Sequence, residues 1–237
     1  MVKEHILSGG RTTTEIVRIG NTVRRPIGHN SEFTHTLLKL LERKRFDYSP
    51  RFLGIDEKGR EILSFIKGST LHENIKCTND QLVTIARVIK KFHNATDGSK
   101  LAGNKEIICH NDIAPWNIVM RADIPIGMID FDGAAPGRRV DDFGYFLWTF
   151  LKLGSDIDIT VQIARIRLLC NTYGFHDGKK LVGAIDKQQK SILTMRQRIA
   201  KTATDPEARK FSSAKAAEIL SEIKWLQSNR RVLEHSF

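Results

Sequence analysis

The chain has 237 residues, of which 41% are hydrophobic and 27% charged, and it carries a formal net charge of +11. These values are typical of a soluble globular protein with one large domain or two small lobes. They exclude a helical membrane protein, because no apolar run approaches the roughly 20 residues that a spanning helix needs. The N-terminus also lacks the long apolar segment of a secretory signal.

The cysteines and the positive charge indicate where the protein works and what it binds. Three cysteines are an odd number without metal-like spacing, which favours reduced thiols and a cytoplasmic location. Much of the positive charge lies after residue 143, where it is interpreted as solvated helix faces. A nucleic-acid surface is the less favoured alternative, because no known nucleic-acid module is present.

The first 66 residues predict a small β-rich region with one helix. Residues 5–27 are typical of three short strands, and Pro26 ends the third. Ser31 is placed to cap a helix that runs to about Lys44. A hairpin of Arg51–Ile55 and Glu61–Ile66 is expected next.

The remaining residues predict a mostly helical region with polar hairpins inserted. Lys67 to Ser69 is interpreted as a linker, and a helix is expected over Asn79–Thr96. A strand at 107–108 and a hairpin of residues 117–129 follow. From Asp141 on, the pattern is helical, with breaks near Gly154, 174–178 and 204–206. The predicted fold is therefore α+β, with a β-rich lobe over residues 1–67, a helical lobe over 68–237 and a small-molecule cleft between them.

The most informative residues lie between Cys109 and Asp132. Asp112 stands five residues before Asn117, and Asp130 follows a short apolar segment. Phosphoryl transfer needs such a set, since one carboxylate accepts the proton of the attacking hydroxyl. An amide oxygen and a second carboxylate then hold the magnesium ion that bridges the nucleotide phosphates.

Three motifs resemble those of the aminoglycoside phosphotransferase family, which has the two-lobed protein-kinase-like fold. They are His110-Asn111-Asp112 with Asn117, the segment Ile129 to Ala134, and Asp142-Phe143-Gly144. The resemblance is specific from Ile107 to Trp148 and weaker elsewhere. It implies Mg²⁺ and ATP, or possibly GTP, as the phosphoryl donor. It further implies Asp112 as the catalytic base, Asn117 and Asp130 as metal ligands, and His110 and Asp142 as supporting residues.

The resemblance also implies a nucleotide site in the first lobe. Gly9 and Gly10 are expected to bring backbone amides close to the phosphates, although Gly-Gly is also a common hairpin turn. Ser64, Phe65 and Ile66 are expected to form a hinge that offers backbone groups to adenine.

Arginine stands where the family has a lysine on the third strand. Strand alternation puts Arg24 and Arg25 on opposite faces, and Arg24 is expected to contact the phosphates. Glu32 is its expected partner, unless that carboxylate only stabilises the helix N-terminus.

The leading functional hypothesis is a small-molecule kinase that phosphorylates a hydroxyl group. The alternative is a kinase-fold protein with little activity that binds a nucleotide or a partner, of an immunity or regulatory type. The missing lysine and the short first lobe favour the alternative, whereas the joint presence of Asp112, Asn117 and Asp130 opposes it. The acceptor stays open between an aminoglycoside and another alcohol. Asp132 is left open between a second magnesium site, a cationic substrate group and a solvated loop.

Overall fold

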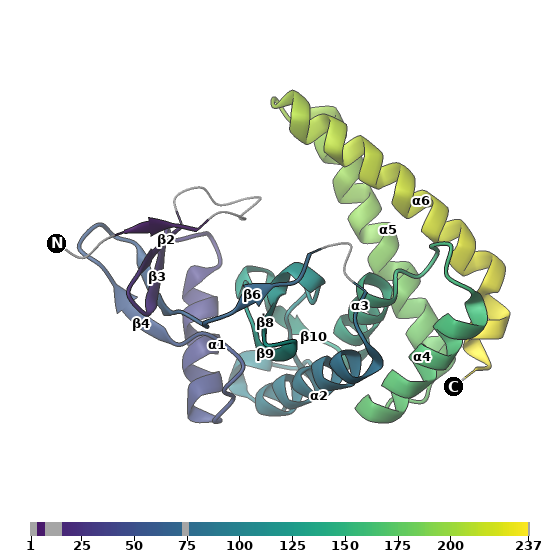
Figure 1. Cartoon of the computed structure of the whole chain (residues 1–237), viewed down its shortest axis with the longest axis horizontal. Coiled ribbons are helices and arrows are strands. Elements are labelled where there is room, and N and C mark those ends of the chain that lie inside the picture. Colours follow the sequence, from purple (N-terminus) through teal and green to yellow (C-terminus); the bar gives the residue numbers. More distant parts are fainter. Residues whose placement is uncertain (1–3, 8–15, 73–75, 237) are drawn as a thin grey trace. The chain divides into compact units, whose positions relative to one another are not determined.

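The computed structural model of the chain describes residues 4–7, 16–72 and 76–236. The chain divides into two compact units (Figure 1). Residues 1–75 and 88–138 form the first unit, whereas residues 76–87 and 139–237 form the second. Helix α2 (Asn79–Thr96) passes from one to the other. The predicted lobe boundary at residue 67 falls within the first unit, so that division stays a prediction.

The first unit begins with a five-stranded antiparallel sheet and one helix. The strand order is β1-β2-β3-β5-β4, and every neighbouring pair is antiparallel. Helix α1 buries Leu37, Leu38 and Leu41, the apolar stripe that its sequence predicts. The element bounds are β1 (His5–Ile6), β2 (Val17–Ile19), β3 (Thr22–Arg25), α1 (Ser31–Arg43), β4 (Phe52–Ile55) and β5 (Glu61–Ser64).

The second half of the first unit carries the polar segments. A three-stranded sheet has the order β6-β8-β9, and β10 pairs with β7 in a separate ladder. Gly68 lies so close to β8 that an added Cβ would stand 2.3 Å from the carbonyl oxygen of Met120. The predicted linker is therefore packed against this sheet. The strands are β6 (Ser69–Thr70), β7 (Ile107–Cys109), β8 (Ile118–Arg121), β9 (Ile124–Met128) and β10 (Ala135–Gly137).

The second unit is helical, as predicted from Asp141 onward. Its helices are α3 (Arg139–Leu151), α4 (Ile159–Tyr173), α5 (Gly178–Thr202) and α6 (Pro206–Glu234). Asp158, Asp177 and Asp205 each accept a backbone N–H at the start of a helix, which explains the predicted breaks. With its antiparallel N-terminal sheet and larger helical C-terminal part, the structure confirms the predicted α+β class. No described helix has the length and apolar character needed to cross a membrane.

One carboxyl group in the second unit is held in an unfavourable environment. Burial raises the pKa of the Glu222 carboxyl from its ordinary 4.5 to about 7, although Trp148 Nε1 donates a hydrogen bond to it at 2.9 Å. The folded chain therefore keeps this proton to a higher pH than the unfolded chain. Its contribution to stability is complete below about pH 4.5 and is lost as the pH rises through about 7.

We expect Glu222→Gln to remove this pH dependence. Between about pH 5 and about pH 8, the free energy of unfolding of the wild type should fall by about 2 kcal/mol relative to the variant. Urea unfolding followed by circular dichroism measures the difference. Glu207→Gln, on an exposed part of the same helix, serves as the control. An equal pH dependence in wild type and Glu222→Gln would contradict the prediction.

Candidate functional site

The hairpin of β8 and β9 brings Asn117 and Asp130 to one end of its sheet. Ile118 pairs with Met128, and the N–H of Ile129 donates to the carbonyl oxygen of Asn117 at 3.0 Å. The tight turn at Ala122 and Asp123, both with positive φ, sets this register. Asn117 directly precedes β8, and Asp130 follows β9 by one residue, so the pairing holds the two predicted metal ligands close together.

Asp112 is joined to Asn117 by side-chain hydrogen bonds. Asn117 Nδ2 donates to Asp112 Oδ2 at 2.8 Å and to the Asp112 carbonyl oxygen at 2.9 Å. Trp116 Nε1 lies 3.4 Å from the same carboxylate oxygen. Because the amide nitrogen of Asn117 is the donor, its amide oxygen is the atom that could ligate a metal. The structure thus brings the predicted base and the predicted ligand together.

Two residues of this segment have left-handed backbone conformations. Asn111 has φ 64° and Asp130 has φ 66°. Asn111 Nδ2 donates to the carbonyl oxygen of Gly133 at 2.8 Å, which links the two loops. Non-glycine residues adopt this conformation at a cost, and such residues concentrate at functional sites.

His110 is part of the packed support below the loops. It is fully buried, its Nε2 lies 3.0 Å from the carbonyl oxygen of Ile129, and its ring centroid lies 4.6 Å from that of Phe131. These contacts link the segment containing Asp112 to the segment containing Asp130. They are what a supporting residue would make, as predicted.

The charges around Asp130 oppose its ionisation. Burial raises the pKa of Asp130 above its ordinary value, and the neighbouring carboxylate of Asp132 raises it further. Arg25 and His110 act in the opposite direction, and Asp112 adds a smaller repulsion. Three carboxyl groups therefore share one electrostatic environment, which a cation would relieve.

The structure brings Arg25, rather than the predicted Arg24, to this site. Arg25 is buried and donates to both carboxylate oxygens of Asp132, one of these bonds measuring 3.0 Å, and its Nη1 lies 3.8 Å from Asp130 Oδ1. Arg24 occupies the other face of β3, where it contacts Thr22 and lies 3.6 Å from Asp56. The alternation of the two arginines was predicted correctly, but the assignment of their faces to the site was reversed.

The carboxylate partner of the arginine is Glu61, not Glu32. Glu61 stands directly opposite Arg25 in the register of β3 and β5, is fully buried and accepts from Arg25 Nε. His35 Nε2 of α1 lies 2.6 Å from its other oxygen. Glu32 is exposed in the first turn of α1 and makes no ion pair with a described residue, which fits the alternative that it stabilises the helix N-terminus.

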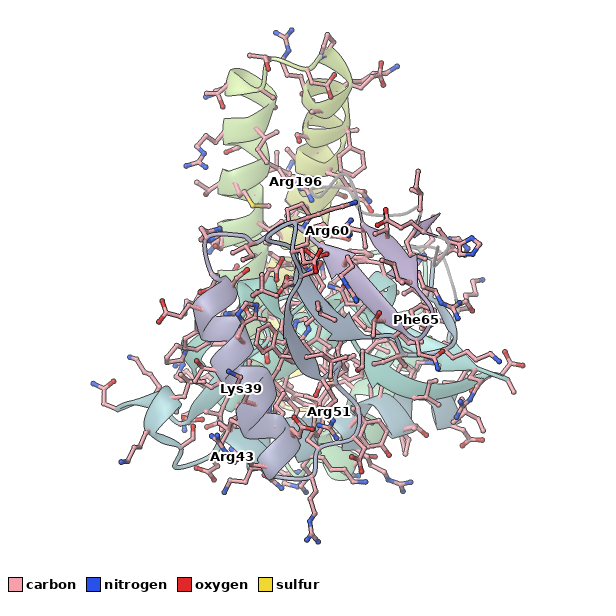
Figure 2. All side chains as sticks on the ribbon, turned by 90° about the vertical axis from the view of Figure 1, so that its left-hand side faces the viewer. Lys39, Arg43, Arg51, Arg60, Phe65 and Arg196 are labelled. Atoms are coloured by element: carbon pink, nitrogen blue, oxygen red, sulfur yellow. The ribbon has the colours of Figure 1, made fainter. Side chains whose placement is uncertain are left out.

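The hinge residues offer fewer free groups than predicted. The N–H of Ser64 donates to the carbonyl oxygen of Arg51, and that of Phe65 donates to Asn21, both at 2.9 Å. The edges of the sheet therefore already use two of the three expected donors. Phe65, visible in Figure 2, is covered by the guanidinium of Arg18 at 4.1 Å from its ring centroid. Of the predicted donors, the N–H of Ile66 remains the candidate.

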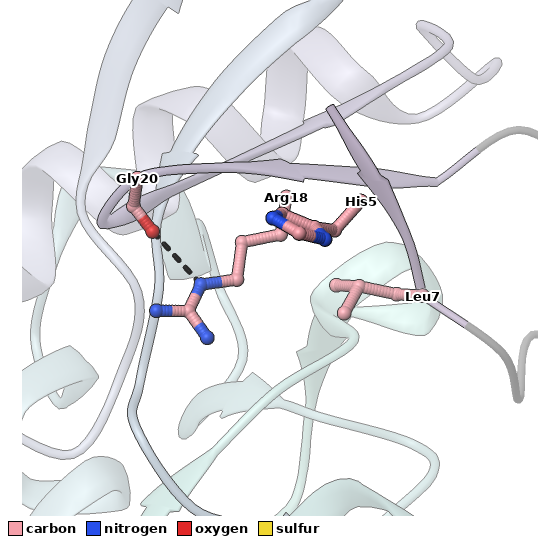
Figure 3. Close-up of a pocket in the computed structure, with 4 residues that line it drawn as sticks. All are labelled: His5, Leu7, Arg18 and Gly20. Carbon is pink, nitrogen blue, oxygen red and sulfur yellow. Dashed lines mark hydrogen bonds between the residues drawn. The ribbon is translucent and has the colours of Figure 1, made fainter. Parts of the chain in front are cut away.

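A cavity of about 390 Å³ opens on β1 and β2. Among the described residues it is lined by His5, Leu7, Arg18 and Gly20, and Figure 3 shows Arg18 Nε bonded to the carbonyl oxygen of Gly20. The stacking of Arg18 on Phe65 connects the cavity to the hinge. Gly9 and Gly10 lie outside the described residues.

Asp142 lies in the second unit, fully buried in the first turn of α3. Its predicted support of the catalytic loop therefore stays a prediction. Asp141, one residue earlier, faces Lys187 of α5 across 3.7 Å, so acidic residues of this turn are used within the second unit.

The donor set of the first unit fits magnesium. Among the described residues, no group of three or more His, Cys, Asp or Glu side chains could hold a metal alone. Magnesium keeps several waters and usually needs only one or two protein ligands besides phosphate oxygens. The amide oxygen of Asn117 and the carboxylate of Asp130 are hard donors of the kind it prefers, and Asp130 lies in surplus negative charge.

An antiparallel sheet with a buried strand cation, an Asp-x-x-x-x-Asn loop and a second Asp after a hairpin define a protein of the kinase-like class. The chain belongs to the phosphotransferase enzyme family, whose profile matches residues 49–178. The family and the fold expected from the motifs are thus confirmed.

Three relatives illustrate the range of this class. A trifolitoxin immunity protein of Rhizobium leguminosarum bv. trifolii is 31% identical over 206 residues, which cover 77% of each chain. An ethanolamine kinase of Plasmodium vivax superposes with a TM-score of 0.69 at 12% identity, over 92% of this chain and 81% of that one. An aminoglycoside phosphotransferase of Streptomyces rimosus, in complex with ADP and streptomycin, gives 0.57 at 11% identity, over 94% and 92%.

Proposed function

We propose that the protein is a magnesium-dependent phosphotransferase that moves the γ-phosphoryl group of ATP to a hydroxyl group of a small molecule. The observation that carries this proposal is the hydrogen bond between Asn117 and Asp112 at the end of the hairpin that also places Asp130. Membership of the phosphotransferase enzyme family supports the reaction class.

Each residue of the site has a distinct task in this reaction. Asp112 orients the acceptor hydroxyl and takes its proton as the new oxygen–phosphorus bond forms and the bond from the γ-phosphorus to the ADP oxygen breaks. Asn117 holds one oxygen of that carboxylate in place through its amide nitrogen. Asn117 and Asp130 would hold the magnesium ion, which neutralises phosphate charge when bound.

Arg25 replaces Arg24 as the proposed phosphate-binding cation. A guanidinium presents parallel N–H groups that match two phosphate oxygens, so an arginine can serve where the family has a lysine. The base is proposed to lie by the hinge, next to Ile66 and the cavity lined by Leu7 and Arg18. The ADP bound to the Streptomyces rimosus relative supports an adenine nucleotide, and GTP is the competing donor to be tested.

The acceptor is proposed only as a small-molecule alcohol. The named relatives act on chemically different compounds, an amino alcohol in one case and an aminoglycoside in the other. The net charge of +11 does not favour a strongly anionic pocket. A neutral or zwitterionic alcohol therefore suits the chain at least as well as a polycation.

A thermal-shift assay followed by a turnover assay tests the proposal. We expect ATP with Mg²⁺ to raise the melting temperature more than either alone, because the ligand set binds them together. ADP release should then depend on one member of a panel of alcohols, with the phosphorylated product identified by mass spectrometry. ATP binding without transfer to any acceptor would contradict the enzyme assignment.

The second candidate is a nucleotide- or partner-binding protein that acts without phosphoryl transfer. It is favoured by the 31% identical relative, which is named an immunity protein rather than a kinase. The replacement of the strand lysine by Arg25 also fits a weak enzyme. Binding of ATP with a rise in melting temperature but no ADP release would select this candidate.

A further inference from the structure

We propose that Asp132 is an internal counter-ion that occupies Arg25 while the site is empty, so that binding of nucleotide and metal proceeds by an exchange of partners. In this exchange Arg25 leaves Asp132 for phosphate oxygens, and the carboxylate of Asp132 turns to the incoming cation beside Asp130. The inference rests on the proposed function insofar as Arg25 is taken to face the nucleotide phosphates.

The contacts of Arg25 show that its outer edge is already in use. Nη1 and Nη2 donate to the two oxygens of Asp132, and Nη1 lies 3.8 Å from Asp130. This bidentate arrangement has the geometry by which a guanidinium binds phosphate. One edge of the fork cannot bind a carboxylate and a phosphate at the same time, so nucleotide must displace Asp132.

The two carboxylate partners of Arg25 differ in how firmly they are held. Glu61 is fully buried, and its second oxygen is bound by His35, whose ring stacks on Phe52 with centroids 3.8 Å apart. The side chain of Asp132 is 44% exposed. Solvent-exposed ion pairs contribute little, whereas buried pairs are costly to break. Glu61 therefore anchors the Nε side permanently, and Asp132 is the partner that can be exchanged.

The backbone around Asp132 is fixed, so that only its side chain needs to move. Asn30 Nδ2 donates to the carbonyl oxygens of Asp132 at 2.8 Å and Ala134 at 3.1 Å. Thr34 Oγ1 donates to the carbonyl oxygen of Phe131 at 3.2 Å. A rotamer change of a half-exposed carboxylate is fast and requires no movement of the loop.

The charge balance favours joint binding of a divalent cation and a phosphate. Arg25 is surrounded by the carboxylates of Glu61, Asp130 and Asp132, which exceed its own charge. A divalent cation beside Asp130 and Asp132 compensates this excess, and it releases the guanidinium for the phosphate. A phosphate without the cation would have to compete with Asp132 unaided.

The exchange predicts opposite effects of two substitutions. Asp132→Asn should tighten the binding of ATP without metal by about tenfold, because the arginine no longer has to leave a charged partner. Arg25→Met should tighten the binding of Mg²⁺ alone by about tenfold, since two carboxylates lose their cation, and it should weaken ATP. A merely structural ion pair would weaken both ligands in both variants.

Isothermal titration of the full chain with ATP in EDTA, and separately with Mg²⁺ alone, tests the exchange. Asp123→Asn, on the exposed hairpin turn, should bind both ligands like the wild type. Arg25→Lys provides a second variant that keeps a charge beside Glu61, and it should show the same effects in weaker form. Melting curves establish that each variant is folded.

The outcomes separate this inference from the proposed function. Opposite shifts in the two variants support the exchange, whether or not phosphoryl transfer occurs. An affinity for metal-free ATP that is unchanged or weaker in Asp132→Asn overturns the exchange but leaves the phosphotransferase proposal standing. No binding of ATP to wild type or Asp132→Asn, with or without Mg²⁺, overturns both.

Discussion

Asp112→Asn is expected to lower kcat by about 10³-fold, the loss that follows removal of a positioned general base. The amide oxygen of the new side chain can still accept the hydrogen bond from Asn117, which in the wild type joins these residues at 2.8 Å. The loop should therefore keep its shape. What is lost is the negative oxygen that orients the acceptor hydroxyl and receives its proton.

The binding of ATP with Mg²⁺ separates a chemical role from a structural one. Because Asn117 and Asp130 are untouched in Asp112→Asn, the Kd for the metal nucleotide should stay within about threefold of the wild type. Asn117→Ala is the contrasting variant, since it removes both the proposed metal ligand and the donor to Asp112, and it should weaken that Kd. A kcat of Asp112→Asn within tenfold of wild type would exclude the residue as the base.

The motif around the site could be predicted from sequence because its geometry is local. Asp112 and Asn117 lie in one short loop, and a two-residue turn at Ala122 and Asp123 fixes the register that brings Asp130 beside them. Such short-range constraints depend little on the rest of the fold. The helices after Asp141 were predictable for the same reason, since aspartate caps mark where three of them begin.

The choice between Arg24 and Arg25 could not be made from the third strand alone. Alternation separates the two side chains but does not tell which face points to the site. The decisive signal lies on another strand, where Glu61 alternates with Leu63 and both are buried. A carboxylate on the core face of a strand demands a cation, and the antiparallel register places Arg25 opposite it.

Long-range pairing also explains the other differences at the site. Glu32 was the nearest acid on the following helix, yet the helix contributes His35, which contacts Glu61. The hinge was expected to offer three N–H groups, but pairing with Arg51 and Asn21 uses two of them. Each of these contacts joins residues far apart in the chain, and hydrophobic periodicity contains no information about such partners.

Glu61→Ala is expected to lower the free energy of unfolding by about 3–4 kcal/mol. Removing one partner of a buried ion pair leaves the other charge without compensation, which costs more than the pair itself contributes. Here the loss strips Arg25 of its inner partner and His35 of its acceptor at 2.6 Å. Urea unfolding measures the change, and Glu42→Ala is the matched control, because Glu42 is 54% exposed and only 3.9 Å from its partner Arg51.

A double-mutant cycle shows whether the loss comes from the uncompensated arginine. If it does, Glu61→Ala combined with Arg25→Met should be less destabilised than the sum of the two single variants, by about 1–3 kcal/mol. Arg25 connects the sheet to the loop of Asp130 and Asp132, so the same cycle measured on ATP affinity reports whether its position depends on Glu61. Additive effects on stability would mean that Glu61 acts through packing alone, and Arg25 would then owe its position to Asp132.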